Sequence, residues 1–395
     1  MIASIVSPRL IRVGGGAVAQ VAEILQTLSL SRPLVVTDPY MVSSGLARRC
    51  LDPLAAAGIV ADVFSDTVPE PTDTVIEAGV ARLQGRNYDC LIGFGGGSPI
   101  DTAKAMAILA HGRAAGLGSH MRDFKVPVTS DAARLPVIAI PTTAGTGSEA
   151  TRFTVVTDTE RDEKMLIAGL AALPLAAIVD YELTFTVPPR ITADTGIDSL
   201  THALEAYVSR RANLYSDTQA LAAMRLIGAH LRTAYAEPHN KSAREAMMLG
   251  AMQAGIAFTN SSVALVHGMS RPIGAHFHVP HGLSNAMLLP AITRFGLNSA
   301  ETRYAAAARQ IGFAAPADAD PVAADRLAEG LAQLNRDLDV PTPAAFGIDK
   351  REWDEKLPLM ARQALASGSP ANNPRVPTEA EIVALYQVVW SDNLR

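Results

Sequence analysis

The sequence has 395 residues, which is long for a single hydrophobic core and suggests two domains. Hydrophobic residues make up 48% of the chain and charged residues 18%, a composition typical of a globular protein. The formal net charge is −5 and no run of Lys or Arg exceeds a pair, which excludes a basic surface for nucleic acid or acidic membrane. We therefore expect small molecules as partners.

The N-terminus lacks the basic and apolar regions of a signal peptide, and no apolar run approaches the ~20 residues that span a bilayer. The two cysteines, Cys50 and Cys90, do not form a CxxC motif. We expect both to be buried free thiols in a reducing compartment, and we place the protein in the cytoplasm.

The first part of the chain alternates between short apolar runs and helical patterns. The expected strands are 33–38, 59–64, 89–94, 135–140 and 176–180, and the expected helices are 17–28, 44–57, 73–83 and 99–111. This alternation predicts an α/β domain with a mostly parallel sheet covered on both faces. Ligands of such sheets bind beyond the carboxyl ends of the strands, so the loops after Phe94 and Ile140 are the candidate sites.

The strand pattern stops after about Leu183, where Pro188 and Pro189 interrupt the chain. From Ile191 onward the sequence is rich in Ala, Leu and Met at helical intervals. We therefore predict an α/β domain over residues 1–184 and an all-α domain over residues 185–395. Residues 316–321 and 367–377 are expected to be surface loops.

A triple-glycine turn follows the strand that ends at Phe94. It reads Gly95-Gly96-Gly97-Ser98-Pro99-Ile100-Asp101. Ser98 fits the N-cap of a helix, Pro99 its first position and Asp101 its third position, where the carboxylate would hold the turn. The glycines let a ligand approach the backbone, and the N–H groups of a helix start favour an anion such as a pyrophosphate. The alternative is a tight turn without a ligand, because the segment is not a GxGxxG motif.

The loop after the next strand is also rich in glycine and hydroxyl groups. It contains Thr142, Thr143 and Thr146, which offer donors and acceptors for ribose and phosphate oxygens. Taken alone it could be a polar connection, but two such loops at one edge of a sheet indicate a nucleotide site.

Asp38 ends an early strand. An acidic side chain there could accept hydrogen bonds from an adenosine ribose and would repel a 2′-phosphate, which favours NAD over NADP. A turn residue before Pro39 is an equally good interpretation.

Four residues of the second domain form a candidate metal site. Asp198 and His202 are four apart in an expected helix, so they project from one face. His267 and His281 are separated by Pro272, Gly274 and Pro280 and cannot share one straight helix with each other. Three imidazoles and one carboxylate suit Fe²⁺ or Zn²⁺ better than Mg²⁺ or Ca²⁺. The alternative is a set of ordinary polar residues on partly buried helices.

In order and spacing, the two glycine-containing loops, the Asp198/His202 pair and the His267/His281 pair closely resemble the iron-containing (group III) alcohol dehydrogenase family. The resemblance implies a dehydroquinate synthase-like architecture, with an N-terminal dinucleotide-binding domain, a C-terminal metal-binding and substrate domain, and a cleft between them. It also implies a homodimer.

The resemblance further assigns roles to individual residues. Metal ligands would be Asp198, His202, His267 and His281; the dinucleotide would be held by Gly95, Gly96, Gly97, Ser98, Asp101, Thr142, Thr143 and Thr146. Asp38 would approach the adenosine ribose and Lys164 the nicotinamide-side ribose, while Leu183 would pack on the cofactor. Taken alone, Lys164 would be a surface charge and Leu183 a core residue.

One position departs from the family pattern. Many members carry a histidine for proton transfer four residues after the third ligand, where this chain has Arg271. Arginine cannot act as a base near neutral pH; Arg271 either binds an anionic group of the substrate or, as we favour, pairs with an acidic neighbour. His278 is then the candidate proton-relay residue, with His276 as an alternative, although either could be an ordinary packed or exposed imidazole.

The predicted function is a metal-dependent oxidoreductase that transfers a hydride between NAD(H) and a small alcohol, aldehyde or ketone. Fe²⁺ is the expected metal, with Zn²⁺ as the alternative because it can outcompete iron at N/O sites. The competing hypotheses are a lyase of the dehydroquinate synthase type, a glycerol dehydrogenase-like polyol oxidoreductase and a non-catalytic assembly domain. The lyase would require more basic residues to grip a phosphorylated substrate than the metal region offers.

Overall fold

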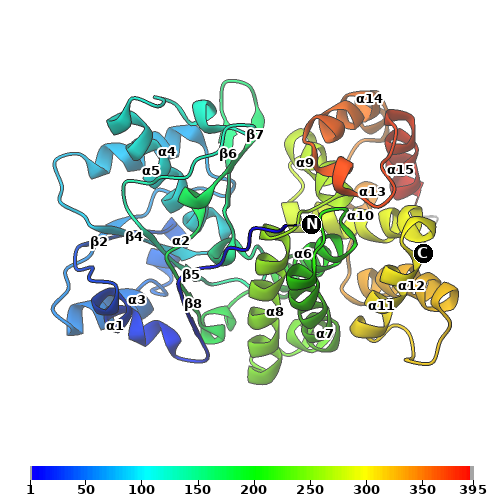
Figure 1. The fold of residues 1–395 in the computed structure, drawn as a ribbon, viewed down its shortest axis with the longest axis horizontal. Coiled ribbons are helices and arrows are strands. Elements are labelled where there is room, and N and C mark those ends of the chain that lie inside the picture. The colour runs from blue at the N-terminus through cyan, green and yellow to red at the C-terminus, as the bar shows by residue number, and fades with distance from the viewer. Residues whose placement is uncertain (1, 392–395) are drawn as a thin grey trace. The chain divides into compact units, whose positions relative to one another are not determined.

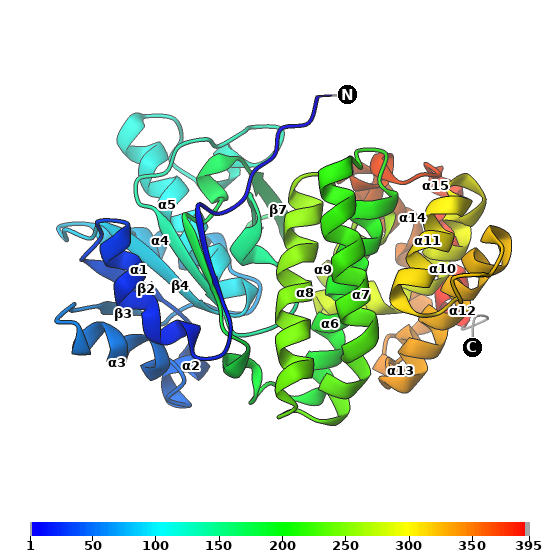
Figure 2. The same cartoon turned by 60° about the horizontal axis from the view of Figure 1, so that its bottom comes forward.

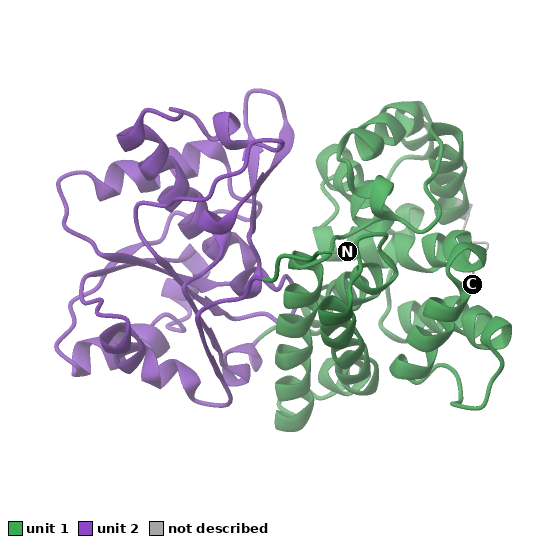
Figure 3. Cartoon of the chain, viewed as in Figure 1, with its two compact units in different colours: residues 1–5, 187–395 green, residues 6–186 purple. Residues whose placement is uncertain are grey.

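The computed structural model describes residues 2–391 and divides into two compact units (Figure 3). The α/β unit comprises Val6–Thr186, and the helical unit starts at Val187 and includes a short N-terminal segment. Within the part of the chain that the structure describes, no helix combines the length and apolarity needed to cross a membrane.

A six-stranded sheet forms the centre of the α/β unit. Its strands, in spatial order, are β1 (Leu10–Val13), β8 (Ala176–Val179), β5 (Val137–Pro141), β4 (Cys90–Gly95), β2 (Pro33–Val36) and β3 (Asp62–Phe64). Every neighbouring pair is parallel. The predicted parallel sheet is therefore confirmed.

Helices cover both faces of this sheet (Figure 1). Side chains alternate along a strand, so Leu34 and Val36 join the core under α4 (Asp73–Leu83) and α5 (Gly97–Ala115). Val35 joins the opposite core, with 3₁₀-helix η1 (Ala17–Gln20), α1 (Val21–Thr27), α2 (Pro39–Ser43) and α3 (Arg48–Ala56).

Both cysteines lie in the second of these cores as free thiols, as predicted. Burial raises the pKa of Cys50 to about 12 and that of Cys90 further still. Neither thiol is therefore reactive in the folded protein.

An antiparallel hairpin was not predicted. It pairs β6 (Phe153–Asp158) with β7 (Glu163–Ala168). Burial alternates along β6, as expected for a strand with one covered face. Short 3₁₀-helices complete the unit: η2 (Met121–Phe124), η3 (Ser148–Ala150), η4 (Leu170–Ala172) and η5 (Tyr181–Thr184).

The helical unit contains no strand among its described residues, as predicted. Its helices are α6 (Pro189–Val208), α7 (Leu214–Ala236), α8 (Lys241–Thr259), α9 (Leu265–Phe277), α10 (His281–Gly296), α11 (Glu301–Ile311), α12 (Asp320–Asp337), α13 (Pro343–Phe346), α14 (Lys350–Ala366) and α15 (Glu379–Ser391), with 3₁₀-helices η6 (Leu297–Ser299) and η7 (Ser369–Asn372).

Helix α6 is central to the helical unit. It packs beside α7 and α8 (Figure 2), where glycines on α6 and α8 allow close approach: Gly196 faces Leu231 and Gly250 faces Ile227. From Thr192 to Val208 nearly every residue of α6 is buried. Buried ionisable side chains need hydrogen-bond or charged partners. The buried acidic and imidazole side chains of this helix therefore indicate a polar site inside the unit.

As predicted, His267 and His281 do not share one straight helix, whereas one predicted surface loop was partly wrong. Helix α9 passes through Pro272 and Gly274, and the break between the two histidine-bearing helices comes at His278, which has a left-handed φ of 53°. The predicted surface loop 367–377 is partly interior, because Ser369 is only 6% exposed.

Candidate metal centre and dinucleotide site

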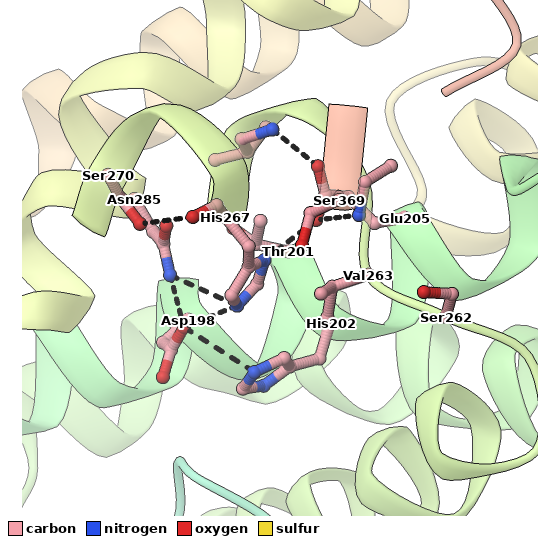
Figure 4. A network of polar contacts seen from close by, with 12 residues as sticks. Asp198, Thr201, His202, Glu205, Ser262, Val263, His267, Ser270, Asn285 and Ser369 are labelled. Carbon is pink, nitrogen blue, oxygen red and sulfur yellow. Dashed lines mark hydrogen bonds and ion pairs between the residues drawn. The ribbon is translucent and has the colours of Figure 1, made fainter. Parts of the chain in front are cut away.

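Asp198, His202 and Glu205 lie on one face of α6. Their spacing of four and then three residues places them one above the other along about two turns. All three are at most 5% exposed. One helix therefore presents two carboxylates and one imidazole to the interior of the unit (Figure 4).

Two further histidines converge on Asp198 from other helices. His267 lies in the first turn of α9, and His281 is the first residue of α10. From Asp198 Oδ1 the distance to Nε2 is 3.5 Å for His267 and 3.9 Å for both His202 and His281. Asp198, His267 and His281 each offer a ligand atom within 4.8 Å of the other two.

These distances fit a shared cation. Two ligand atoms each about 2.1 Å from a tetrahedral metal lie about 3.4 Å apart. The ligand atoms around Asp198 are separated by slightly more than this. A donor set of imidazole nitrogen and carboxylate oxygen suits Fe²⁺ or Zn²⁺.

The electrostatics of the cluster favour the ligating form of Asp198. Burial alone would raise the pKa of its carboxyl group, but the charges of His202 and His281 and a hydrogen bond with His267 hold that pKa well below its ordinary value. Asp198 is therefore an anion at any physiological pH and can bind a cation.

His267 is held from the opposite side of its ring. Burial would lower the pKa of His267, but hydrogen bonds with Asp198 and Glu205 raise it to about 9. Its Nδ1 lies 2.7 Å from Glu205 Oε2. Glu205 was not among the predicted site residues, although it follows Asp198 at helical spacing of seven.

Asn285 also lay outside the predicted set. Its Nδ2 donates to Asp198 Oδ1 at 2.6 Å and lies 3.2 Å from Nε2 of His267 and 3.3 Å from Nε2 of His281. The spacing of four residues from His281 along α10 is the sequence signal that could have indicated it.

Phe258 forms an apolar wall beside the cluster. Its ring stacks on His202 with centroids 4.4 Å apart, and His202 stacks in turn on His267 at 4.5 Å. These contacts fix the plane of the His202 ring and limit the water around it.

The residues considered for proton transfer occupy different environments. Arg271 donates to Ser369 Oγ at 3.2 Å, and His276 contacts Gln363 Oε1 at 2.8 Å. His278 is exposed at the turn between α9 and α10, three residues before His281.

In the α/β unit, the two predicted loops lie against each other at the carboxyl ends of β4 and β5. Gly95 pairs with Pro141 in the sheet register, and Thr142 N donates to Gly95 O at 2.8 Å. A Cβ atom on Gly97 would lie 2.8 Å from Thr146 Cγ2, so only glycine permits this approach. The two loops that were expected to share one edge therefore do so.

The predicted capping pattern of α5 was wrong. The helix begins at Gly97 with Gly96 as N-cap and no capping side chain, so Ser98 and Pro99 lie inside the first turn. Without a capping side chain, the first N–H groups of α5 are left for an anionic ligand.

Asp101 belongs instead to a buried network under the two loops. It accepts from Ser148 Oγ at 2.6 Å and from Val155 N at 2.9 Å. The fully buried Lys104 donates to Ser148 Oγ at 2.9 Å and to Phe153 O at 2.8 Å. Burial lowers the pKa of Lys104 to about 8 and raises that of Glu149 to about 7. This network connects α5, the loop after β5 and β6.

The remaining predicted cofactor residues are spread over the α/β unit. Asp38 is the N-cap of α2, with one carboxylate oxygen accepting from Met41 N at 2.9 Å. Lys164 on β7 pairs with Glu70 at 2.5 Å, and Glu70 N donates to Ser98 Oγ at 3.2 Å, which connects Lys164 to the glycine turn. Leu183 is 1% exposed and belongs to the same apolar core as Val35 and the two cysteines.

Two family models match this chain and together cover most of it. Residues 8–181 match the model described as iron-containing alcohol dehydrogenase, and residues 192–390 match the C-terminal model of the Fe-containing alcohol dehydrogenase family. The chain belongs to the iron-containing alcohol dehydrogenase family.

Individual relatives of this dehydrogenase are similar over their whole length. A long-chain-alcohol dehydrogenase of Geobacillus thermodenitrificans is 38% identical, with 100% of this chain and 98% of the relative covered. The crystal structure of a 1,3-propanediol oxidoreductase superposes with a TM-score of 0.92 at 33% identity, covering 98% of this chain and 100% of that one. A sulfoacetaldehyde reductase of Bifidobacterium kashiwanohense, solved with NAD⁺, gives a TM-score of 0.88 at 30% identity and full coverage of both chains.

The predicted family, fold class and enzyme class are thereby confirmed. The protein is an oxidoreductase of the alcohol dehydrogenase type in an iron-containing family, and the competing lyase hypothesis is not supported.

Proposed function

We propose that this alcohol dehydrogenase binds a divalent metal, Fe²⁺ by expectation and Zn²⁺ as the alternative, through Asp198, His202, His267 and His281. The observation that carries the proposal is the approach of three imidazole Nε2 atoms to one carboxylate oxygen at 3.5–3.9 Å. The reaction is the interconversion of an alcohol and NAD⁺ with a carbonyl compound, NADH and a proton.

The metal, when bound, supplies Lewis-acid polarisation of the substrate oxygen. The residues of the chain supply the ligands and exclude water from part of the site. Three neutral imidazoles and one carboxylate neutralise only half of the charge of a divalent cation. The ring of Phe258 keeps water from one side of His202.

We assign dinucleotide binding to residues 1–184 and metal and substrate binding to residues 185–395. Gly95, Gly96, Gly97 and Ser98 offer backbone to the pyrophosphate, and Thr142, Thr143 and Thr146 offer hydroxyl groups. We propose that Asp101 supports the turn from beneath and does not contact the dinucleotide, because its carboxylate already accepts hydrogen bonds from Ser148 and Val155.

NAD(H) is the expected cofactor. The sulfoacetaldehyde reductase relative binds NAD⁺. At Asp38 one carboxylate oxygen caps α2, and the acidic group would repel a 2′-phosphate at the adenosine ribose. Lys164 would approach the nicotinamide-side ribose, and Leu183 would support the cofactor from within the core.

His278 is our candidate for the proton relay. It lies in an exposed turn that leads directly to the ligand His281, so it can exchange protons with solvent. Arg271 donates to Ser369 and, with an arginine pKa above about 12, is not a base.

The proposed substrates are small alcohols and the corresponding aldehydes or ketones. The named relatives act on long-chain alcohols, 1,3-propanediol and sulfoacetaldehyde, which share a primary alcohol or aldehyde at the reacting carbon. We further propose a homodimer in the cytoplasm.

Anaerobic metal analysis combined with a cofactor-linked screen of alcohols and aldehydes tests the proposal. We expect one metal ion per chain and a change in NADH absorbance that is lost when Asp198, His202, His267 and His281 are all replaced by alanine. Undiminished alcohol oxidation by that variant would refute the metal site. Turnover without net NADH change would instead indicate lyase chemistry.

A further inference from the structure

Glu205 binds three N–H groups at once and is itself only 3% exposed. Its Oε2 accepts from Ala264 N at 2.8 Å and from His267 Nδ1 at 2.7 Å, and its Oε1 accepts from Val266 N at 2.6 Å. Figure 4 shows Glu205 on the far side of His267 from Asp198.

Two of these donors belong to the start of α9. The first N–H groups of a helix have no partner within it, and the N-cap residue Ala264 has no side chain that could accept from them. The carboxylate of Glu205 therefore caps α9 from another helix, and its negative charge is also favoured at the positive end of the helix dipole.

The third donor is a proposed metal ligand. A carboxylate can only accept hydrogen bonds, so the shared hydrogen must lie on His267 Nδ1. In the neutral ring, which is the form that binds a metal, the lone pair of His267 is then on Nε2, the nitrogen that lies 3.5 Å from Asp198 Oδ1 and faces the cluster. Glu205 thus selects the ring nitrogen that is offered to a cation.

We propose that Glu205 is a positioning residue for the metal site: it couples the ligand-bearing face of α6 to the start of α9 and fixes the ring orientation and tautomer of His267. This inference rests on the proposed metal site. It adds that one face of α6, at positions 198, 202 and 205, provides two ligands and the support for a third.

Glutamine at position 205 cannot reproduce these three contacts. If its oxygen faces His267 and Ala264, its amide nitrogen points at the N–H of Val266, which is also a donor. If it is turned over, its nitrogen faces the N–H of Ala264 and the Nδ1 of His267, which favours a hydrogen on Nε2 and blocks ligation. Either orientation weakens the site without changing the size of the side chain.

The experiment compares metal binding by the full-length wild type, Glu205→Gln and the control Asp217→Asn. Asp217 lies on α7 in the same unit, and its carboxylate forms an ion pair with Arg303 at 2.5 Å. Apoproteins are titrated with Zn²⁺ in competition with a chromophoric chelator, and Co²⁺ spectra report the ligand field. Circular dichroism establishes that each variant is folded, and hydrogen exchange follows the amides of Ala264 and Val266.

We expect Glu205→Gln to lose about 10–100-fold in metal affinity, to change the Co²⁺ spectrum and to exchange the two amides faster, while Asp217→Asn matches the wild type. Unchanged affinity and an unchanged Co²⁺ spectrum in Glu205→Gln would overturn the inference but leave the metal site intact. Faster amide exchange with unchanged affinity would reduce Glu205 to a helix cap and also overturn it. If the wild type itself binds no metal, the proposed function fails instead.

If Glu205→Gln does not fold, Glu205→Asp provides the second variant. It keeps the charge but shortens the reach to His267, so the same loss of affinity is expected in a folded protein. Wild-type affinity in this variant would count against the inference.

Discussion

His267 is the proposed ligand whose protonation should control metal binding. Burial opposes its protonation, but contacts with Asp198 and Glu205 raise its pKa to about 9 in the metal-free protein. At pH 7 a metal must therefore displace a proton from His267, and affinity should rise with pH until about pH 9. Calorimetric titration of the apoprotein in two buffers of different ionisation enthalpy should report about one proton released per metal at pH 7. Binding without proton release would contradict this prediction.

Glu149 should make the α/β unit less stable as pH rises. Burial raises the pKa of Glu149 from 4.5 to about 7, so between these values the folded state binds more protons than the unfolded state. Its contribution to the free energy of unfolding therefore falls across this range, by about 3 kcal/mol at about 1.4 kcal/mol per pKa unit.

Urea denaturation from pH 4.5 to 7 tests this effect. Glu149→Gln should flatten the fall in unfolding free energy, whereas the matched change at the exposed residue Glu245 should not. An equal slope in the wild type and Glu149→Gln would show that Glu149 does not titrate in this way.

The four proposed ligands could be predicted from the sequence, but their supporting residues could not. The spacing of Asp198 and His202 places them on one helix face, and the resemblance joins them to His267 and His281. Glu205 and Asn285 act through contacts between different helices, Glu205 with the start of α9 and Asn285 with Asp198. Such contacts leave no unambiguous signal in one sequence.

At the scale of elements, the close approach of the two loops proposed to bind the nucleotide has a measurable consequence. Alanine at Gly97 would place a methyl group 2.8 Å from Thr146 Cγ2, so the loops must separate. We expect Gly97→Ala to raise KM for NAD⁺ about 10-fold or more, in line with about 1.4 kcal/mol for each factor of ten. Thr146→Ser removes the opposing methyl group and should partly restore KM in the double variant.

This prediction is tested by a double-mutant cycle, in which steady-state kinetics and melting temperatures are measured for the two single variants and the double variant. Unchanged KM in Gly97→Ala would show that the loops can separate freely. A fall in melting temperature without a change in KM would give the glycine a purely structural role.

The predicted elements were most accurate where a pattern was long and least accurate where tertiary contacts decide. The helix expected at 73–83 is found as α4 (Asp73–Leu83), because its apolar period and the N-cap Thr72 agree. The hairpin of β6 and β7 was missed because charged residues such as Glu163 and Lys164 obscure its alternation. The predicted separation of His267 and His281 onto different helices is found, although α9 runs through Pro272 before it ends at Phe277.

At the scale of the whole molecule, the proposed ligands come from three helices of one unit. A bound cation would tie α6, α9 and α10 together, and binding to the folded state at 1,000 times Kd adds about 4.1 kcal/mol to stability. We predict that metal removal speeds hydrogen exchange in these three helices and leaves the central strands β4 and β5 protected. Hydrogen exchange with mass spectrometry measures this directly. Equal deprotection of the sheet would contradict it.

Because both cysteines are buried, their reactivity can be used to measure how often the core of the α/β unit opens to solvent. Cys50 and Cys90 sit in one apolar core on one face of the sheet, with pKa values raised by burial. A chromogenic disulfide reagent should therefore modify them only at the rate at which that core opens. The yellow thiolate that the reagent releases would report the rate of opening without any introduced label. Saturating NAD⁺ should slow the colour change, whereas instantaneous labelling of the native enzyme would mean that the core is open to solvent.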